Sequence, residues 1–171
     1  SIHANLFPLA FGLVPAEHQQ SVADYVVSRG MSCSVYAAQY LMEALYRSGR
    51  ANEAFDLLTS QDIRSWYNMI RVGSTITLEA WDNKFKPNQD WNHAWGAAPA
   101  NLVGRYLLGV RPLEPGFVKT LIQPQPGSLT RASGQVPTPL GPVTVSIRNE
   151  PEGKFELDVT IPEGMTARIE I

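Results

Sequence analysis

The chain has little of what several protein classes require. It contains one cysteine, Cys33, so it cannot form a disulfide within itself. Because Cys33 lies in an apolar run with helical spacing, a buried structural thiol is favoured over a catalytic nucleophile. No run of like charges is present, and the net charge is −2 with an isoelectric point near 5.9. This balance argues against nucleic acid or an anionic membrane as a partner and favours a neutral ligand.

Long hydrophobic runs are also missing. The apolar start, residues 1–15, has no positive flank, contains Pro8 and is too short to cross a bilayer, so we expect neither a signal peptide nor a membrane span. With 171 residues, 44% hydrophobic and 18% charged, the chain is expected to be globular. Ser1 follows no methionine and Ile171 ends inside an alternating run, which leads us to expect a fragment of a longer protein.

Helical periods dominate up to about residue 110. Pro15 suits a first helical position, Ser34 is a good N-cap, and Gly109 is a natural stop. The apolar residues between these signals recur three and four positions apart, which predicts amphipathic helices. The expected helices cover residues 15–30, 34–49, 51–59, 63–70 and 92–108.

The period falls to two after residue 116, which predicts an all-β module. The alternating runs, separated by proline and glycine, are typical of a small antiparallel sandwich. They cover residues 117–124, 131–138, 143–150, 154–161 and 166–171. Residues 149–154, "NEPEGK", predict a hairpin loop, and residues 109–116, "GVRPLEPG", predict a link that two prolines stiffen.

Short loops between amphipathic helices fit two architectures, a barrel of paired helices or an α-solenoid. No sequence repeat of fixed length is visible, which weakens the solenoid. A closed double ring needs roughly a dozen helices, and about five are expected here. If the barrel is correct, the remaining helices precede Ser1 in a longer chain.

The segment from Gly73 to Ala100 gathers three of the four tryptophans around acidic side chains and a histidine. Glu79 lies in a connection between helices, where a rigid scaffold places its chemistry, although an isolated loop glutamate is usually only solvated. Aromatic faces stack on sugars while carboxylates and amides bind hydroxyls. Trp81 and Trp91 beside Glu79 therefore predict a saccharide subsite.

Other residues of this segment leave alternatives open. Trp95 shares a helical face with Ala98, so packing in the core is favoured over contact with a ligand. For His93, a polar contact with ligand and a helix-capping role are equally balanced. A glycosidase needs two carboxyl groups, but Asp82 is only three residues from Glu79, and we expect the second group elsewhere.

Together, these motifs resemble a known family. The stretches "GSTITLEAWD", "NHAWGAAPANLVGRYLLGVRPLEPGFVKTLIQPQ", "ASGQVPTPLGPVTVSI" and "FELDVTIPEGMTARIEI" are similar to the C-terminal part of bacterial α-L-rhamnosidases, glycoside hydrolase family 78. Earlier stretches, "ANLFPLAFGLVP" and "YAAQYLMEALYRSGRANEAFDLL", resemble the late barrel helices of that family. The resemblance covers nearly the whole chain, and the order of its motifs makes it specific.

The resemblance implies an α+β multidomain fold: the end of an (α/α)6 catalytic barrel in residues 1–110, then a C-terminal β-sandwich in residues 111–171. The implied enzyme is an inverting α-L-rhamnosidase acting on a rhamnose-containing glycoside or oligosaccharide, with no cofactor and no metal. Glu79 falls on the family's proposed general base, His93 on a histidine that touches rhamnose, and Trp81 on the aromatic position after the glutamate. The barrel part should pack with the missing N-terminal part of its own chain.

Two departures limit what the resemblance implies. Ala80 stands where the family often has an arginine or a second aromatic residue, so the surroundings of the base can differ. The family's general acid lies in an earlier barrel loop, so we expect the isolated fragment to be inactive. Three alternatives stay open: a barrel glycosidase of another sugar preference, a lyase, and a non-catalytic glycan-binding protein. The compartment is not predicted.

Overall fold

Helix α3, Val35–Arg47, lies at the centre of the helical part of the computed structural model, which describes residues 1–150 and 153–171. The expected N-cap is confirmed, because the Ser34 hydroxyl accepts the Ala37 N–H at 3.2 Å. The predicted apolar stripe of this helix is buried. At its other end, the Arg47 guanidinium donates to the Ala10 carbonyl at 2.9 Å and ties α3 to α1.

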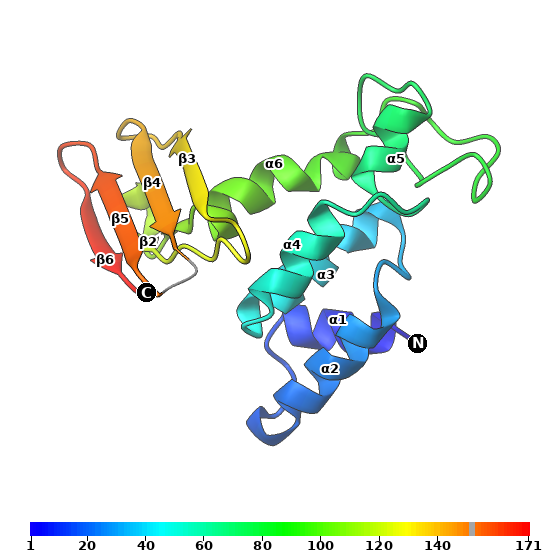
Figure 1. The fold of residues 1–171 in the computed structure, drawn as a ribbon, viewed down its shortest axis with the longest axis horizontal. Coiled ribbons are helices and arrows are strands. Elements are labelled where there is room, and N and C mark those ends of the chain that lie inside the picture. Colours follow the sequence, from blue (N-terminus) through cyan, green and yellow to red (C-terminus); the bar gives the residue numbers. More distant parts are fainter. Residues whose placement is uncertain (151–152) are drawn as a thin grey trace. The chain divides into compact units, whose positions relative to one another are not determined.

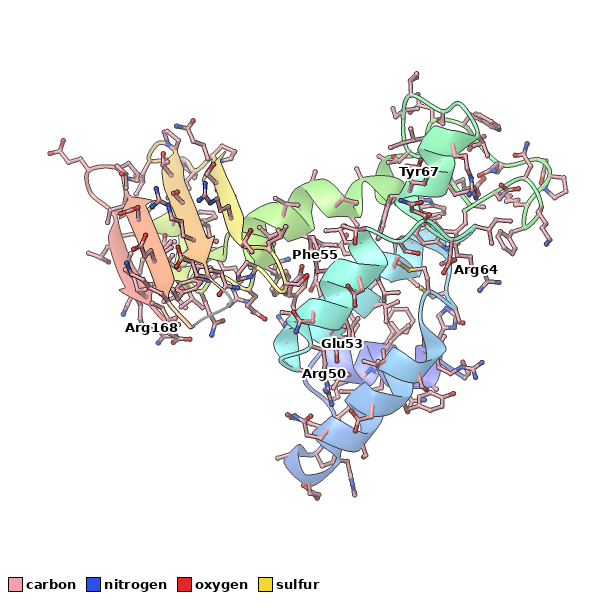
Figure 2. The ribbon with its side chains drawn as sticks, in the orientation of Figure 1. Arg50, Glu53, Phe55, Arg64, Tyr67 and Arg168 are labelled. Carbon is pink, nitrogen blue, oxygen red and sulfur yellow. The ribbon has the colours of Figure 1, made fainter. Side chains whose placement is uncertain are left out.

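Five helical elements accompany α3 between residues 1 and 71 of the first unit, which covers residues 1–100 (Figure 1). They are α1 (His3–Ala10), the short 3-10 turn η1 (Ala16–His18), α2 (Gln19–Arg29), α4 (Ala51–Leu58) and α5 (Trp66–Arg71). Helix α3 contacts α1, α2 and α4. Arg50, at the start of α4, pairs with Asp24 of α2. It also pairs, at 3.6 Å, with Glu53, and Figure 2 labels both of these residues.

Two helices differ from the sequence expectation. Helical spacing did not predict α1, because Pro8 inside it removes a backbone donor and interrupts the usual helix signal. The helix expected over residues 63–70 begins at Trp66, since the Ser65 hydroxyl accepts the Asn68 N–H at 3.1 Å and caps it there. Local capping therefore set a boundary that apolar periodicity alone placed three residues too early.

The segment expected as one helix over residues 92–108 is helical from residue 94 to residue 107, but it is not uniform. It starts as the 3-10 turn η2 (Ala94–Ala97), continues as α6 (Ala98–Leu102) and ends as the π-helical turn η3 (Val103–Leu107). Different hydrogen-bond patterns turn the chain by different angles per residue. A stripe counted at the α-helical period therefore does not continue through the first turn.

The second unit, residues 101–171, contains two three-stranded sheets (Figure 1). The strands of one sheet, in spatial order, are β1 (Val110–Pro112), β2 (Lys119–Ile122) and β6 (Thr166–Ile169). Those of the other are β3 (Arg131–Val136), β4 (Val143–Asn149) and β5 (Phe155–Thr160). Strand β4 buries every second residue at its start, as the alternating pattern predicts.

An all-antiparallel module was expected, and this is wrong for one pair. Strand β6 runs parallel to β2, with Lys119 opposite Thr166 and Ile122 opposite Ile169. The chain leaves β5 for the other sheet, so no hairpin fixes the direction of β6 against its neighbour. Strand β1 was also missed, because its prolines favoured a link; Pro112 ends an edge strand, where a missing N–H is tolerated.

Two further expectations concern the ends and connections of elements. The predicted loop over residues 149–154 includes Pro151 and Glu152, which lie outside the described residues, while the strands β4 and β5 on either side pair antiparallel. Across the described part of the chain, no helix combines the length and the apolar composition that crossing a lipid bilayer requires. The division between residues 1–110 and 111–171 stays a prediction.

Candidate functional site

A cavity of about 580 Å³ lies within the helical unit, and the tryptophan-rich segment forms one side of it. The start of α3 and the turn before it, residues 32–36, form another side. Arg64, in the segment between α4 and α5, also lines the cavity (Figure 2). The remaining lining residues are His3, residues 79–81, residues 85–86 and Trp95. The family resemblance assigns roles to Glu79, Trp81 and His93, and of these Glu79 and Trp81 line this cavity, whereas His93 and Trp91 are not among its lining residues.

Residues 79–90 form a loop that is closed by hydrogen bonds at its base. The Glu79 N–H donates to the Asp90 carbonyl at 3.0 Å, and the Asp90 N–H donates back to Glu79 Oε2, also at 3.0 Å. Gln89 is buried inside the loop, where its Oε1 accepts the Ala80 N–H at 2.9 Å and its Nε2 donates to Asn83 at 2.8 Å. These bonds hold Glu79 at a fixed place although the segment has no regular secondary structure.

The Glu79 carboxylate is held in its charged form. Its side chain is only 15% exposed, and Oε1 pairs with the Lys86 ammonium group. The hydrogen bond from Lys86 lowers the pKa of Glu79 below its ordinary value, and the Asp90 N–H, the Lys86 charge and nearby His93 lower this pKa further. A lowered pKa keeps the Glu79 carboxyl group ionised at neutral pH, and an ionised carboxylate is able to accept a proton.

His93 and Trp95 lie beside this carboxylate as a stacked pair. Their ring centroids are 3.9 Å apart and their planes differ by 2°. Thr77 fixes the backbone of His93: the His93 N–H donates to the Thr77 carbonyl at 2.9 Å, and the Thr77 hydroxyl donates to the His93 carbonyl at 2.7 Å. Trp95 Nε1 donates to the Glu79 carbonyl at 3.3 Å. Histidine, tryptophan and glutamate thus belong to one constellation.

The expectation that Trp95 packs in the core is wrong. Its side chain is 40% exposed and lines the cavity, while Ala98, on the same predicted helical face, is buried. Trp95 lies in the 3-10 turn η2, so the α-helical period does not carry it to the buried face. The ring of Trp95 packs in a tilted arrangement against that of Tyr36 of α3, with centroids 5.3 Å apart. Aromatic side chains from two segments therefore line this side of the cavity.

Trp81 has the opposite environment. It is 3% exposed, its Nε1 donates to the Cys33 carbonyl at 2.8 Å, and its ring meets Trp66 edge-on at a centroid distance of 5.2 Å. It contributes to the cavity wall and also fastens the Glu79 segment to the turn before α3. Cys33 is buried as expected, and burial raises the pKa of its thiol to about 12, so it is not a thiolate nucleophile.

Asp82 is directed to α5. Its Oδ2 accepts from the Asn68 side chain at 2.9 Å, and its Oδ1 accepts the Lys84 N–H at 2.9 Å. The Lys84 N–H and then the Asn68 amide lower the pKa of Asp82. Its bonds make Asp82 a structural carboxylate of the loop. Among the described residues, no group of three or more His, Cys, Asp or Glu side chains is placed to hold a metal ion.

Sequence reasoning did not single out Lys86 as a residue of this site. It follows Glu79 by seven positions in an irregular loop, a spacing that implies no contact, so the sequence carried no signal for the pair. The Arg64 guanidinium, which lies 4.6 Å from the centroid of the Phe85 ring, was missed for the same reason.

Two protein-family models together match almost the whole chain. Residues 1–107 match the bacterial alpha-L-rhamnosidase 6 hairpin glycosidase domain, and residues 109–171 match the bacterial alpha-L-rhamnosidase C-terminal domain. The chain belongs to the bacterial α-L-rhamnosidase family. The resemblance identified from the motifs is confirmed, as is the fold class of barrel hairpins followed by a β-rich module.

Individual rhamnosidases align along nearly the whole chain. A curated α-L-rhamnosidase of Alteromonas sp. (strain LOR) is 30% identical over 178 residues, which cover 96% of this chain and 19% of the relative. The solved structure of native α-L-rhamnosidase from Aspergillus terreus superposes with a TM-score of 0.86 at 24% identity, covering 99% of this chain and 21% of that one. At this identity the structural likeness shows the fold alone.

A second solved structure, the Streptomyces avermitilis α-L-rhamnosidase complexed with L-rhamnose, superposes with a TM-score of 0.84 at 23% identity. It covers 99% of this chain and 18% of that chain. The present chain thus spans about a fifth of the length of the rhamnosidases that it matches.

Proposed function

We propose that this chain carries the general-base side of an inverting α-L-rhamnosidase active site, with Glu79 as the base. The observation that carries the proposal is the state of Glu79 in the cavity, where an ion pair and a backbone N–H keep it a carboxylate. Family membership and the names of the relatives support the substrate class, a terminal α-L-rhamnosyl group on a glycoside or oligosaccharide. Residues 1–110 are then the end of an (α/α)6 barrel and residues 111–171 a C-terminal β-sandwich.

The proposed reaction moves two protons. Glu79 removes a proton from a water molecule. At the same time the water oxygen bonds to the anomeric carbon, and the glycosidic carbon–oxygen bond breaks. A carboxylic acid outside this chain protonates the leaving oxygen, and the two carboxyl groups lie roughly 6.5–9.5 Å apart to admit the water. The chain packs with the part of the longer protein that supplies this acid. The reaction needs no cofactor, because both proton transfers use side chains.

The aromatic and imidazole groups beside Glu79 serve the sugar. His93, held by Thr77 and stacked on Trp95, binds a rhamnose hydroxyl. The exposed Trp95 offers a flat apolar face to the carbon–hydrogen side of the ring, a role for which the sequence favoured Trp81. Trp81 acts on the site through the position of the Glu79 loop, because its own ring is almost fully covered.

The test is hydrolysis of p-nitrophenyl α-L-rhamnoside by the full protein that contains these residues and by its Glu79→Gln variant. Loss of the base is expected to lower kcat by about 10²–10⁴-fold with a small change in KM. The control is Asp82→Asn, in the same loop but directed to α5. Proton NMR of the first sugar released is expected to show the inverted anomer.

Two results contradict the proposal in different ways. Turnover of another p-nitrophenyl sugar, or eliminative cleavage of a uronic acid polymer, keeps the fold and replaces the substrate class. Glycan binding without turnover of any substrate makes the protein a non-catalytic binder.

A further inference from the structure

We propose that Lys86 is a positioning residue for Glu79: its ammonium group anchors one carboxylate oxygen and so orients the carboxylate. The inference rests on the proposed function and adds to it a second residue of the base. Lys86 Nζ pairs with Glu79 Oε1, and the Asp90 N–H binds Oε2 at 3.0 Å. Both oxygens are therefore anchored, one by a side chain and one by the backbone, and the carboxylate plane cannot rotate freely.

Anchoring leaves the carboxylate able to act. Each ionised carboxylate oxygen can accept about two hydrogen bonds, so the bonds to Lys86 and Asp90 leave acceptor capacity for a water molecule. The cavity supplies the space, because Glu79 and Lys86 both line it. A base that is already oriented loses little conformational freedom when the water binds, and this is the usual advantage of a positioned catalytic group.

The loop delivers the lysine to this place through its own turn. The Phe85 N–H donates to the Asp82 carbonyl at 3.0 Å, and the Gln89 N–H donates to the Lys86 carbonyl at 3.1 Å. These two turns bracket Lys86 and fix its backbone, while buried Gln89 ties the loop back to Ala80. Hydrogen bonds before and after Lys86 thus fix its backbone, and this places its ammonium group beside the Glu79 carboxylate.

Besides Glu79, the cavity is lined by the titratable side chains of Lys86, Arg64, His3, Cys33 and Tyr36. Lys86 comes from the same loop and His93 from the segment before η2, and both favour the charged carboxylate. Arg64 lines the cavity from the segment before α5. Of these groups, Lys86 makes the direct ion pair and has the largest effect, so its removal is expected to raise the pKa of Glu79.

The kinetic test compares Lys86→Met, Lys86→Arg and the control Lys84→Met in the full protein. Lys84 is an exposed lysine of the same loop. With the rhamnoside as substrate, kcat is measured against pH, and the acid limb is the part of this profile where kcat falls at low pH. Lys86→Met is expected to move the acid limb to higher pH. Its loss of kcat is expected to be smaller than that of Glu79→Gln, for which about 10²–10⁴-fold is expected. Lys86→Arg keeps the charge and restores the acid limb, and Lys84→Met leaves the limb unchanged.

A second readout does not depend on activity. Carbon NMR of selectively labelled glutamate in the full protein that contains this chain reports the titration of the Glu79 carboxyl group, assigned with Glu79→Gln. Lys86→Met is expected to raise that pKa, and Lys84→Met to leave it in place. If Lys86→Met does not fold, Lys86→Gln and Lys86→Arg provide the same comparison.

The outcomes separate the two proposals. If Glu79→Gln retains full turnover, the general-base assignment fails whatever Lys86 does. If Glu79→Gln is inactive while Lys86→Met keeps both the wild-type acid limb and the wild-type carboxyl pKa, the role of Lys86 alone is overturned. A raised carboxyl pKa together with a shifted acid limb, both restored by Lys86→Arg, supports the proposal.

Discussion

Trp81 is one of the residues that attach the Glu79 loop to the rest of the helical unit, and its replacement by phenylalanine measures that attachment. The indole N–H donates to the Cys33 carbonyl at 2.8 Å, and the side chain is 3% exposed. Phenylalanine keeps an aromatic ring that can still meet Trp66 edge-on, but it has no donor. The substitution therefore removes the hydrogen bond and part of the packing without removing the ring.

The magnitude follows from two contributions. Leaving the buried carbonyl of Cys33 without this donor costs about 1–3 kcal/mol. The smaller ring leaves a cavity of roughly 40 Å³, which at about 24 cal/mol per Å³ adds about 1 kcal/mol. Trp81→Phe is therefore expected to lower the free energy of unfolding by about 2–4 kcal/mol.

Urea unfolding followed by circular dichroism in the far ultraviolet measures this change, because the helices lie mainly in the same unit as Trp81. The matched control is Trp91→Phe, the same chemical change at a side chain that is 44% exposed, for which the expected change is within about 0.5 kcal/mol. Equal losses for the two variants would refute the reasoning, because the difference between them isolates the buried donor.

Two further predictions concern the close backbone contact at Gly109, beside the first sheet, and the carboxyl group of Asp82 in the Glu79 loop. Gly109→Ala places a Cβ 2.2 Å from the backbone carbonyl carbon of Gln123, just after β2, and is expected to lower thermal stability. The loss is expected to be much larger than for the control Gly164→Ala, where φ is the same within a degree and the Cβ meets no atom within 4 Å. Equal losses would mean that only the positive φ matters and that the close contact does not. Asp82 has its pKa lowered from 3.8 by the Lys84 N–H and the Asn68 amide, so its stabilisation is present above pH 3.8 and is lost as pH falls through the lower folded pKa. Asp82→Asn is expected to flatten the fall of stability in acid, and an unchanged slope in a urea series over pH contradicts this.

Where the chain gives a local signal, the sequence predicted the structure well. Ser34 caps a helix because its hydroxyl can meet an N–H three residues on, whatever the rest of the fold does. Burial of alternate residues in β4 follows from strand geometry in the same way. Pro8 shows the limit of such signals, since the helix around it forms despite a residue that predicts an ending.

The site was only partly predictable. Its segment stood out through composition, and Glu79 could be singled out by its neighbours and by resemblance. The environments of the two tryptophans were not predictable, however: Trp81 is covered by Trp66 and by the turn at Cys33, while Trp95 is exposed in a 3-10 turn. No period runs through residues 73–93, so no counting rule could assign the buried face.

The sequence by itself determined the division into a helical and a β-rich part, the capped helices, most strands and the family, because each depends on signals read from neighbouring residues or from motif order. Only the tertiary structure decided that Lys86 meets Glu79, that Trp95 lines the cavity, and that β6 runs parallel to β2. These contacts join residues through irregular loops or between strands that are distant in the chain. The tertiary packing of the whole unit decides which residues make these contacts, and local propensity carries no information about that packing.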